Sequence, residues 1–437
     1  MTDIHITREL LEAVSRGEVP ERFLLQIGTQ HLENLCPSCR GEIHAWEARR
    51  AGSADYGYVL QALPAVLARH APELEARLQQ AERDLAALLS LPEEERRPRI
   101  ERAQSRFRGP FLAELLIEES RQQIPGHPEE AYHLAELARF VIHRSPGTPE
   151  SFNLVALASA SMANARRAGG DLREADELFR HVRYVVTHHG VTDPQALAQI
   201  DHLEGSLRSD QRLFLQAEAL LSRAAVLYRI SGGILDAARV LITMGAMYYQ
   251  QGSLSHAVET TRAALENLPQ DVEPRFYLYA RHNLAVYLTE SGRFREAADL
   301  LEVDAELYAR FPEPWTQLRR SWLQGKIAAG VGDVAAAEQR FTETRDGFVR
   351  QGIGYDAAMV SLDLALLYLK DGRTGEVRRV AEEMVPIFSA QDVHREATAA
   401  LLLFQDAARR EAVTAEMVRE VGAYLEAARG NPELRFR

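Results

Sequence analysis

From Tyr56 onward, the apolar residues of this chain recur at the three- and four-residue spacing of amphipathic α-helices. Short turns containing Gly, Pro or Asp separate these stretches, and strand-like alternation is almost absent. The pattern predicts an all-α protein.

The helical stretches repeat with a fixed period, which is marked by glycines at their ends. These turn glycines stand forty residues apart, at Gly252, Gly292, Gly332 and Gly372. Seven positions earlier stands a small residue, namely Gly245, Ala285, Gly325 or Ala365. Five positions later stands Ala257, Ala297, Ala337 or Val377. Because small residues let two helix axes approach closely and glycine relieves the backbone at a turn, each unit is predicted to be an antiparallel helix pair.

Weaker copies of the unit precede the four clear ones. Gly205 and Ala217 bracket a predicted turn near Arg212, and another unit surrounds "AGGDLREADELF". Two further helices, "HREATAALLLFQDAARR" and "AEMVREVGAYLEAAR", are expected to close the array at its C-terminal end. The sequence therefore divides into residues 1–50, a helical linker at 51–110, repeats at 111–390 and capping helices at 391–437.

The repeat resembles the tetratricopeptide repeat. The residues that carry the resemblance in the best copy are Leu241, Met244, Gly245, Tyr248, Gly252, Leu254, Ala257, Ala264 and Pro269. That family's repeat is about 34 residues long, so a forty-residue period implies longer helices or linkers. The resemblance covers about residues 111–388 and implies a right-handed superhelix of helical hairpins with a concave inner surface.

In tetratricopeptide proteins, the first helix of each pair lines a concave groove that binds peptides or proteins. The register of the repeat places eight residues on or near that surface: Arg239, Tyr249, Tyr279, His282, Asn283, Arg319, Trp322 and Lys326. Several are aromatic or cationic, which are the side-chain types that anchor partners and bind carboxylates. A protein or peptide partner is expected there, although each residue alone has an equally good explanation in packing or surface solvation.

The N-terminal segment carries a different chemistry. Its "HLENLCPSC" holds both cysteines of the chain. Two short helices are predicted before this motif, broken at "RGEVP". His5, His31, Cys36 and Cys39 would form a tetrahedral two-histidine, two-thiolate zinc site. With four protein ligands, the zinc would be structural, because a catalytic zinc keeps one position open for water.

This layout resembles the zinc-finger domain of bacterial anti-sigma factors, over about 40 residues. The resemblance implies that this domain binds a sigma factor, and the absence of a membrane-spanning run from the sequence would make the chain a soluble regulator. One departure is the four residues between His31 and Cys36, where the family usually has three. Pro37 accommodates the extra residue, because the residue before a proline is pushed out of helical geometry and Cys36 would then lie in a turn.

Other interpretations of the motif stay open. His44 could replace His5 as the fourth ligand, and Cys36 and Cys39 could be a redox pair or two buried cysteines without a metal. The zinc domain could also serve only as a cap on the exposed end of the repeats, which would make the chain an assembly scaffold.

Net charge, targeting signals and catalytic motifs restrict the classes of function that the sequence allows. The net charge of −12 argues against nucleic-acid binding, because the chain as a whole repels phosphate. The N-terminus has no signal-peptide pattern and no apolar run is long enough to span a membrane, so a cytoplasmic location is expected. Phosphate loops, nucleophile elbows and metalloprotease motifs are absent from the sequence. The sequence predicts a non-enzymatic interaction protein.

Overall fold

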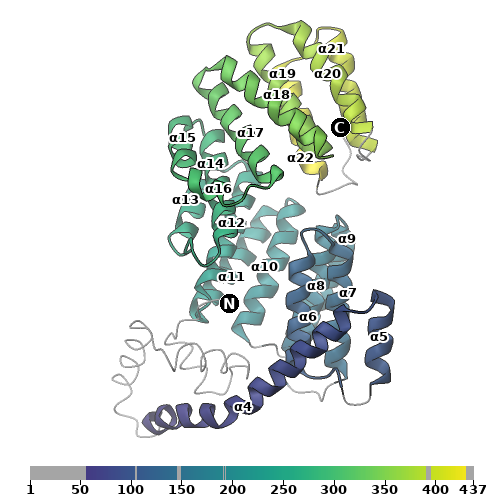
Figure 1. Ribbon diagram of the computed structural model, residues 1–437, viewed down its shortest axis with the longest axis vertical. Coiled ribbons are helices and arrows are strands. Elements are labelled where there is room, and N and C mark those ends of the chain that lie inside the picture. Colours follow the sequence, from purple (N-terminus) through teal and green to yellow (C-terminus); the bar gives the residue numbers. More distant parts are fainter. Residues whose placement is uncertain are drawn as a thin grey trace. The chain divides into compact units, whose positions relative to one another are not determined.

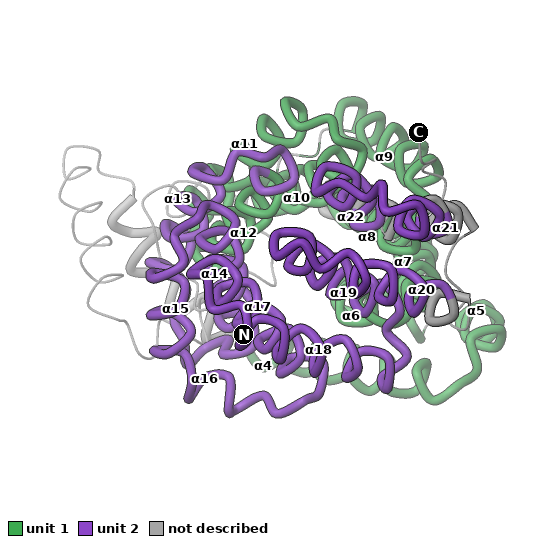
Figure 2. The backbone as a smooth tube through the Cα atoms, turned by 90° about the horizontal axis from the view of Figure 1, so that it is seen from above, with its two compact units in different colours: residues 1–247 green, residues 248–437 purple. Residues whose placement is uncertain are grey.

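A computed structural model describes residues 56–103, 106–144, 149–189, 191, 193–389 and 395–429. All regular structure in these ranges is helical, and the helices form stacked antiparallel hairpins (Figure 1). This confirms the predicted all-α fold of tetratricopeptide-like hairpins. The chain divides into two compact units, residues 1–247 and residues 248–437 (Figure 2).

The described part of unit 1 begins with a long helix and continues as three hairpins. Its helices are α4 (Tyr56–Leu89), α5 (Glu93–Arg102), α6 (Pro110–Gln123), α7 (Pro128–His143), α8 (Pro149–Ala168), α9 (Leu172–His189), α10 (Pro194–Asp210) and α11 (Phe214–Ile230). The pairs α6/α7, α8/α9 and α10/α11 pack closely, and α8 also packs against α6 and α10. The boundary between the units lies within α12 (Ile234–Gln251).

Unit 2 continues the series of hairpins. Its helices are α13 (Leu254–Leu265), α14 (Pro274–Glu290), α15 (Phe294–Val303), α16 (Ala305–Ala309), α17 (Pro314–Val331), α18 (Val334–Arg350), α19 (Gly354–Lys370), α20 (Thr374–Ser389), α21 (Arg395–Arg409) and α22 (Ala415–Arg429). The first helices α14, α17 and α19 pack in a row, and the second helices α15, α18 and α20 lie on the outer side of that row (Figure 2).

The turn glycines have the conformation that the repeat predicted. Gly252, Gly292, Gly332 and Gly372 have φ angles of +85°, +75°, +87° and +68°. The residue after each glycine donates a backbone hydrogen bond to the carbonyl five positions earlier, for example Arg293 to Leu288 at 2.9 Å. This left-handed closure ends the first helix of each hairpin and satisfies its terminal carbonyls.

The small residues lie where two helices of a hairpin meet. Ala285 and Ala365 on first helices, like Ala297 and Ala337 on second helices, are completely buried. A β-carbon on Gly325 would stand 2.7 Å from the ring of Phe341 on the facing helix α18. The repeat positions are therefore contact points of helix pairs, as their spacing predicted.

Two features depart from a regular repeat. The second helix of the hairpin that starts with α14 is interrupted at Asp304, between α15 and α16. The hairpin α21/α22 is reversed: α21 packs against the second helix α20, and α22 packs against the first helix α19. Helix α22 therefore extends the row of first helices.

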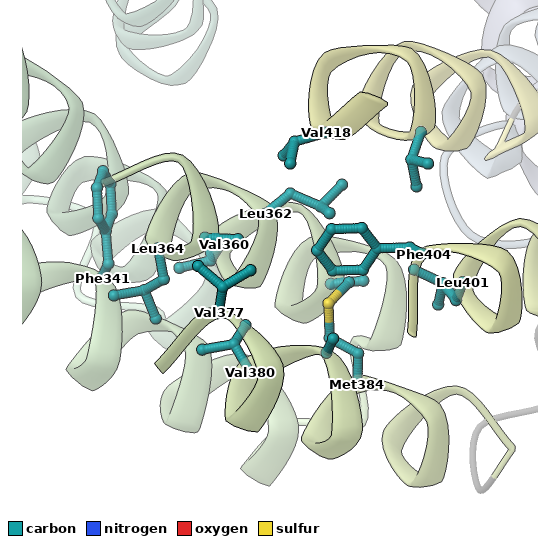
Figure 3. Close-up of a cluster of buried hydrophobic side chains, with 14 of the residues drawn as sticks. Phe341, Val360, Leu362, Leu364, Val377, Val380, Met384, Leu401, Phe404 and Val418 are labelled. Carbon is teal, nitrogen blue, oxygen red and sulfur yellow. The ribbon is translucent and has the colours of Figure 1, made fainter. Parts of the chain in front are cut away.

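The core of the last hairpins is a continuous apolar cluster. Val360, Leu362 and Leu364 from α19 meet side chains from the neighbouring helices, among them Met384 of α20 and Phe404 of α21 (Figure 3). Val418 of α22 belongs to the same cluster, so burial of these side chains packs α22 beside α19.

Candidate partner-binding face of unit 2

The row formed by α14, α17, α19 and α22 presents one surface of unit 2, which we call the first-helix face. The predicted groove residues of α17 occupy a single stripe on it, at i, i+3 or i+4 spacing. This stripe consists of Trp315, Arg319, Trp322 and Lys326. The same spacing on α14 gives a second stripe, formed by Tyr279, Asn283, Val286 and Glu290.

Lys326 links three neighbouring helices at one end of this face. Its Nζ donates a hydrogen bond to Oε1 of Glu290 on α14 at 2.7 Å and lies 4.0 Å from Oδ2 of Asp363 on α19. The indole Nε1 of Trp322 donates to the same Asp363 oxygen at 2.6 Å. We call these four residues the Lys326 cluster. It adds polar contacts between α14, α17 and α19 to the apolar packing of these helices.

The electrostatics of this cluster favour the charged lysine. Burial alone would lower the pKa of Lys326, but the carboxylates of Asp363 and Glu290 raise it above its ordinary value. Burial raises the pKa of Asp363, against the opposing effects of Lys326 and of the Trp322 hydrogen bond. With two carboxylates and one ammonium, the ionised cluster has an excess negative charge. The side chains of Lys326, Glu290 and Asp363 keep 29%, 33% and 19% of their surface exposed, so a ligand can reach them.

Tyr249, from the last turn of α12, lies beside this cluster. Its ring stacks on the buried ring of Tyr287 with 5.1 Å between centroids. Burial, together with the charge of Glu290, raises the pKa of Tyr249 to about 12. The phenol is therefore neutral at physiological pH and can donate or accept a hydrogen bond.

The other end of the face carries exposed aromatic rings. Trp315 is 44% exposed and Tyr279 is 47% exposed, which is unusual for side chains of this size. The guanidinium of Arg319 lies 5.0 Å from the centroid of the Trp315 ring, and Tyr279 stacks on Phe276. Exposed Trp, Tyr and Arg are the residue types that most often dominate binding energy at protein interfaces.

The other predicted groove residues have different positions. His282 is turned into the helix packing, where its Nδ1 is hydrogen-bonded to the hydroxyl of Tyr308 at 2.8 Å. Burial, with a smaller effect of Arg319, lowers the pKa of His282 to about 3. Asn283 lies on the α14 stripe of the face, where it is half-buried. Arg239 belongs to unit 1, where it forms an ion pair with Asp236.

Three polar or aromatic residues of the face escaped the sequence prediction. Trp315 stands four positions before Arg319, so extending the α17 stripe by one turn would have found it. Asp363 is a lone acidic residue in the apolar run "MVSLDLALLYL", a pattern that indicates a buried charge with a partner. Glu290 carries no comparable signal, because acidic residues near a helix end are common.

The proposed zinc ligands His5, His31, Cys36 and Cys39, and the alternative His44, lie outside the described residues. Within the described ranges, no group of three or more His, Cys, Asp or Glu side chains is placed to hold a metal ion. None of the helices that the structure describes combines the length and apolar character needed to cross a bilayer.

Comparisons with known proteins show which solved structures have a similar fold. The sequence matches no protein-family model and no curated protein. Two solved structures align with most of the chain. A Rap protein complexed with competence and sporulation factor has a TM-score of 0.53 and 13% identity, over 73% of this chain and 87% of that one. The apo form of RapI has a TM-score of 0.54 and 12% identity, over 72% of this chain and 87% of that one. The Rap proteins have the same tetratricopeptide-like helical repeats, so this chain is a repeat protein of that fold.

Proposed function

We propose that this chain is a non-enzymatic protein–protein interaction module, which binds a partner on the first-helix face of unit 2. The observation that carries the proposal is the combination of exposed aromatic rings on α14 and α17 with a solvent-accessible charged cluster on the same face. An ordinary solvated helix face has no reason to expose a tryptophan and a tyrosine together.

The two ends of the face suit different parts of one ligand. Trp315 and Lys326 are eleven residues apart on α17, which corresponds to about 16 Å along the helix axis. An extended peptide covers that distance with about five residues. An apolar or aromatic side chain would contact Trp315, and a basic side chain would be attracted to the excess negative charge of Glu290 and Asp363.

The structural comparison supports this assignment. One of the two Rap structures was solved as a complex with competence and sporulation factor, so the fold accommodates a bound factor in that protein. In this chain the corresponding activity would be recognition of a peptide segment, with the helices serving as the rigid frame that positions the contacting side chains.

For the N-terminal segment, we propose a zinc-binding domain with His5, His31, Cys36 and Cys39 as ligands, which binds a sigma factor in the cytoplasm. The ligand layout and its resemblance to anti-sigma zinc fingers support this assignment. Metal analysis of the purified chain should give one zinc per molecule, and Cys36→Ser with Cys39→Ser should abolish it. Protein without stoichiometric zinc would refute the metal site.

Co-purification of the tagged full chain from its host tests the interaction. The double variant Tyr279→Ala/Trp315→Ala should lose a partner of the first-helix face. The control Val303→Ala/Val331→Ala removes two exposed apolar side chains elsewhere on unit 2 and should retain that partner. Equal recovery of the partner by both variants would refute the assignment to this face.

A truncation distinguishes the regulator hypothesis from the scaffold hypothesis. Deletion of residues 1–50 should release a sigma factor while the first-helix face keeps its own partner. If the same deletion lowers only stability and solubility, the N-terminal segment is a cap and the chain is an assembly scaffold.

A further inference from the structure

Unit 2 contains a cleft that the proposed function does not use. It has a volume of about 560 Å³ and runs between α17 and α18. Gln317 and Gln324 line it on α17, and each stands two residues from a member of the first-helix stripe. Because two residues correspond to about 200° of rotation around a helix, the cleft faces away from the first-helix face.

The side chains that line this cleft are mostly cationic or neutral polar. Arg320, Arg340 and Arg350 line it, and Glu343 is the acidic residue among the described lining residues. None of these three arginines forms an ion pair with a carboxylate in the described part of the chain, and Glu343 is engaged by the amide of Gln339 at 2.9 Å. The cleft therefore has an excess positive charge, in a chain whose net charge is −12.

Arg320 is held in place at the middle of the cleft. Its guanidinium lies 4.8 Å from the centroid of the Tyr308 ring, and its Nη2 lies 3.5 Å from the carbonyl oxygen of Leu301. Its Nε is buried and has no hydrogen-bond partner among the described residues. The contacts with Tyr308 and Leu301 hold the guanidinium in one position, so an anionic ligand would meet a pre-organised cation.

The spacing of the arginines indicates the kind of anion. α17 and α18 are antiparallel, and Arg340 and Arg350 are ten residues apart on α18, which places them about 15 Å apart along the helix. A single phosphate is far too small to contact both. A strand of about five extended residues covers this length, so acidic side chains along a peptide can reach all three arginines.

We propose that this cleft binds an acidic, extended segment of a partner protein, at a site separate from the first-helix face. Ser321 and Gln324 line the same cleft and supply polar groups for the peptide backbone, and the buried Thr344 donates a hydrogen bond to the Ser321 hydroxyl at 3.0 Å. The net negative charge of the chain makes general attraction of acidic peptides unfavourable, so binding would depend on the local charge of the cleft.

Fluorescence anisotropy of the full-length protein with labelled hexaglutamate tests this proposal, with hexaglutamine as the uncharged probe. We expect hexaglutamate to bind and hexaglutamine not to bind. The Kd of hexaglutamate should rise with salt concentration. Arg340→Gln/Arg350→Gln should raise that Kd about fivefold or more, because two charge-assisted contacts are lost. Both side chains are exposed, so circular dichroism should show an unchanged fold.

Two controls make the result specific. Arg378→Gln/Arg419→Gln removes the same charge from exposed positions of α20 and α22 and should leave the Kd within about twofold. Trp315→Ala should also leave it unchanged, which separates this cleft from the first-helix face. Equal weakening by both arginine pairs, absence of hexaglutamate binding at low salt, or tighter binding of pyrophosphate than of hexaglutamate would overturn the proposal.

Discussion

The ring of Phe341 on α18 occupies the space that a β-carbon on Gly325 of α17 would need, with 2.7 Å between that position and two ring carbons. Phe341 is almost fully buried and has little freedom to move. The absence of a side chain at Gly325 therefore sets the distance between the two helices of this hairpin.

Gly325→Ala should accordingly destabilise unit 2 by about 1–3 kcal/mol, as expected for overpacking of a buried contact. Hydrogen exchange of α17 and α18, together with the urea unfolding midpoint, measures the effect. Gly375→Ala is the matched control, because no atom lies within 4 Å of its added carbon. Similar stability of the two variants would mean that the helices are not closely packed at Gly325.

Arg212 stands one period before Gly252 and has a left-handed conformation, with φ of 60°. The residue that follows it donates to the carbonyl of Arg208 at 2.8 Å, as in the glycine turns. Arg212→Gly should remove the strain and stabilise unit 1 by about 0.5–1 kcal/mol. Arg212→Ala keeps the strained backbone conformation and should not stabilise unit 1. An equal increase in the free energy of unfolding for the alanine and glycine variants would show that the left-handed conformation of Arg212 is not destabilising.

Asp304 is buried where α15 ends, and Arg281 of α14 holds it. The guanidinium Nε donates to its two carboxylate oxygens at 3.0 and 2.9 Å. Arg281→Met should destabilise unit 2 by about 3 kcal/mol, because it leaves a buried carboxylate without its counter-charge. The additional change Asp304→Asn should restore much of that loss. A double-mutant cycle measures the coupling, and additive effects would contradict this role of the ion pair.

His202 of α10 makes the stability of unit 1 depend on pH. Its Nε2 is hydrogen-bonded to Oγ1 of Thr243 at 2.9 Å. Burial, with Arg167 and Arg239 nearby, lowers the pKa of His202 to about 4. The unfolded chain, with an ordinary histidine pKa near 6.5, binds this proton first, so the stabilisation present at neutral pH is lost as the pH falls from about 6.5 toward 4.

Between pH 7 and pH 5, the free energy of unfolding should fall by about 2 kcal/mol on account of His202. His202→Gln keeps a polar group near Thr243 but cannot titrate, so the loss over this pH range should be smaller by the same amount. Urea unfolding of both proteins at the two pH values measures the difference. Parallel pH dependence in wild type and variant would show that His202 is not buried in its neutral form.

The forty-residue pattern predicted the regular part of the fold because turn glycines and small contact residues act locally. Gly252, Gly292, Gly332 and Gly372 all have the expected left-handed conformation. The break at Asp304 depends on an ion pair with a helix 23 residues earlier, and the reversed α21/α22 hairpin depends on which neighbour α22 packs against. Such tertiary preferences leave no periodic signal in the sequence.

The same distinction applies to the first-helix face. Register placed Arg319, Trp322 and Lys326 on one stripe, because helical spacing alone determines that relation. It could not determine that His282 turns toward Tyr308 or that Glu290 and Asp363 surround Lys326. Those positions depend on contacts between different hairpins, at sequence separations of 26 to 37 residues.

A partner is proposed to bind the first-helix face of unit 2. Site-specific photo-crosslinking in the host measures directly which positions of unit 2 that partner contacts. A benzophenone amino acid at Trp315 samples the first-helix face, and the same amino acid at Val303 samples a more exposed position on α15. We expect a crosslinked partner from position 315 and none from position 303. A partner crosslinked from position 303 and not from position 315 would contradict the assignment of the binding surface.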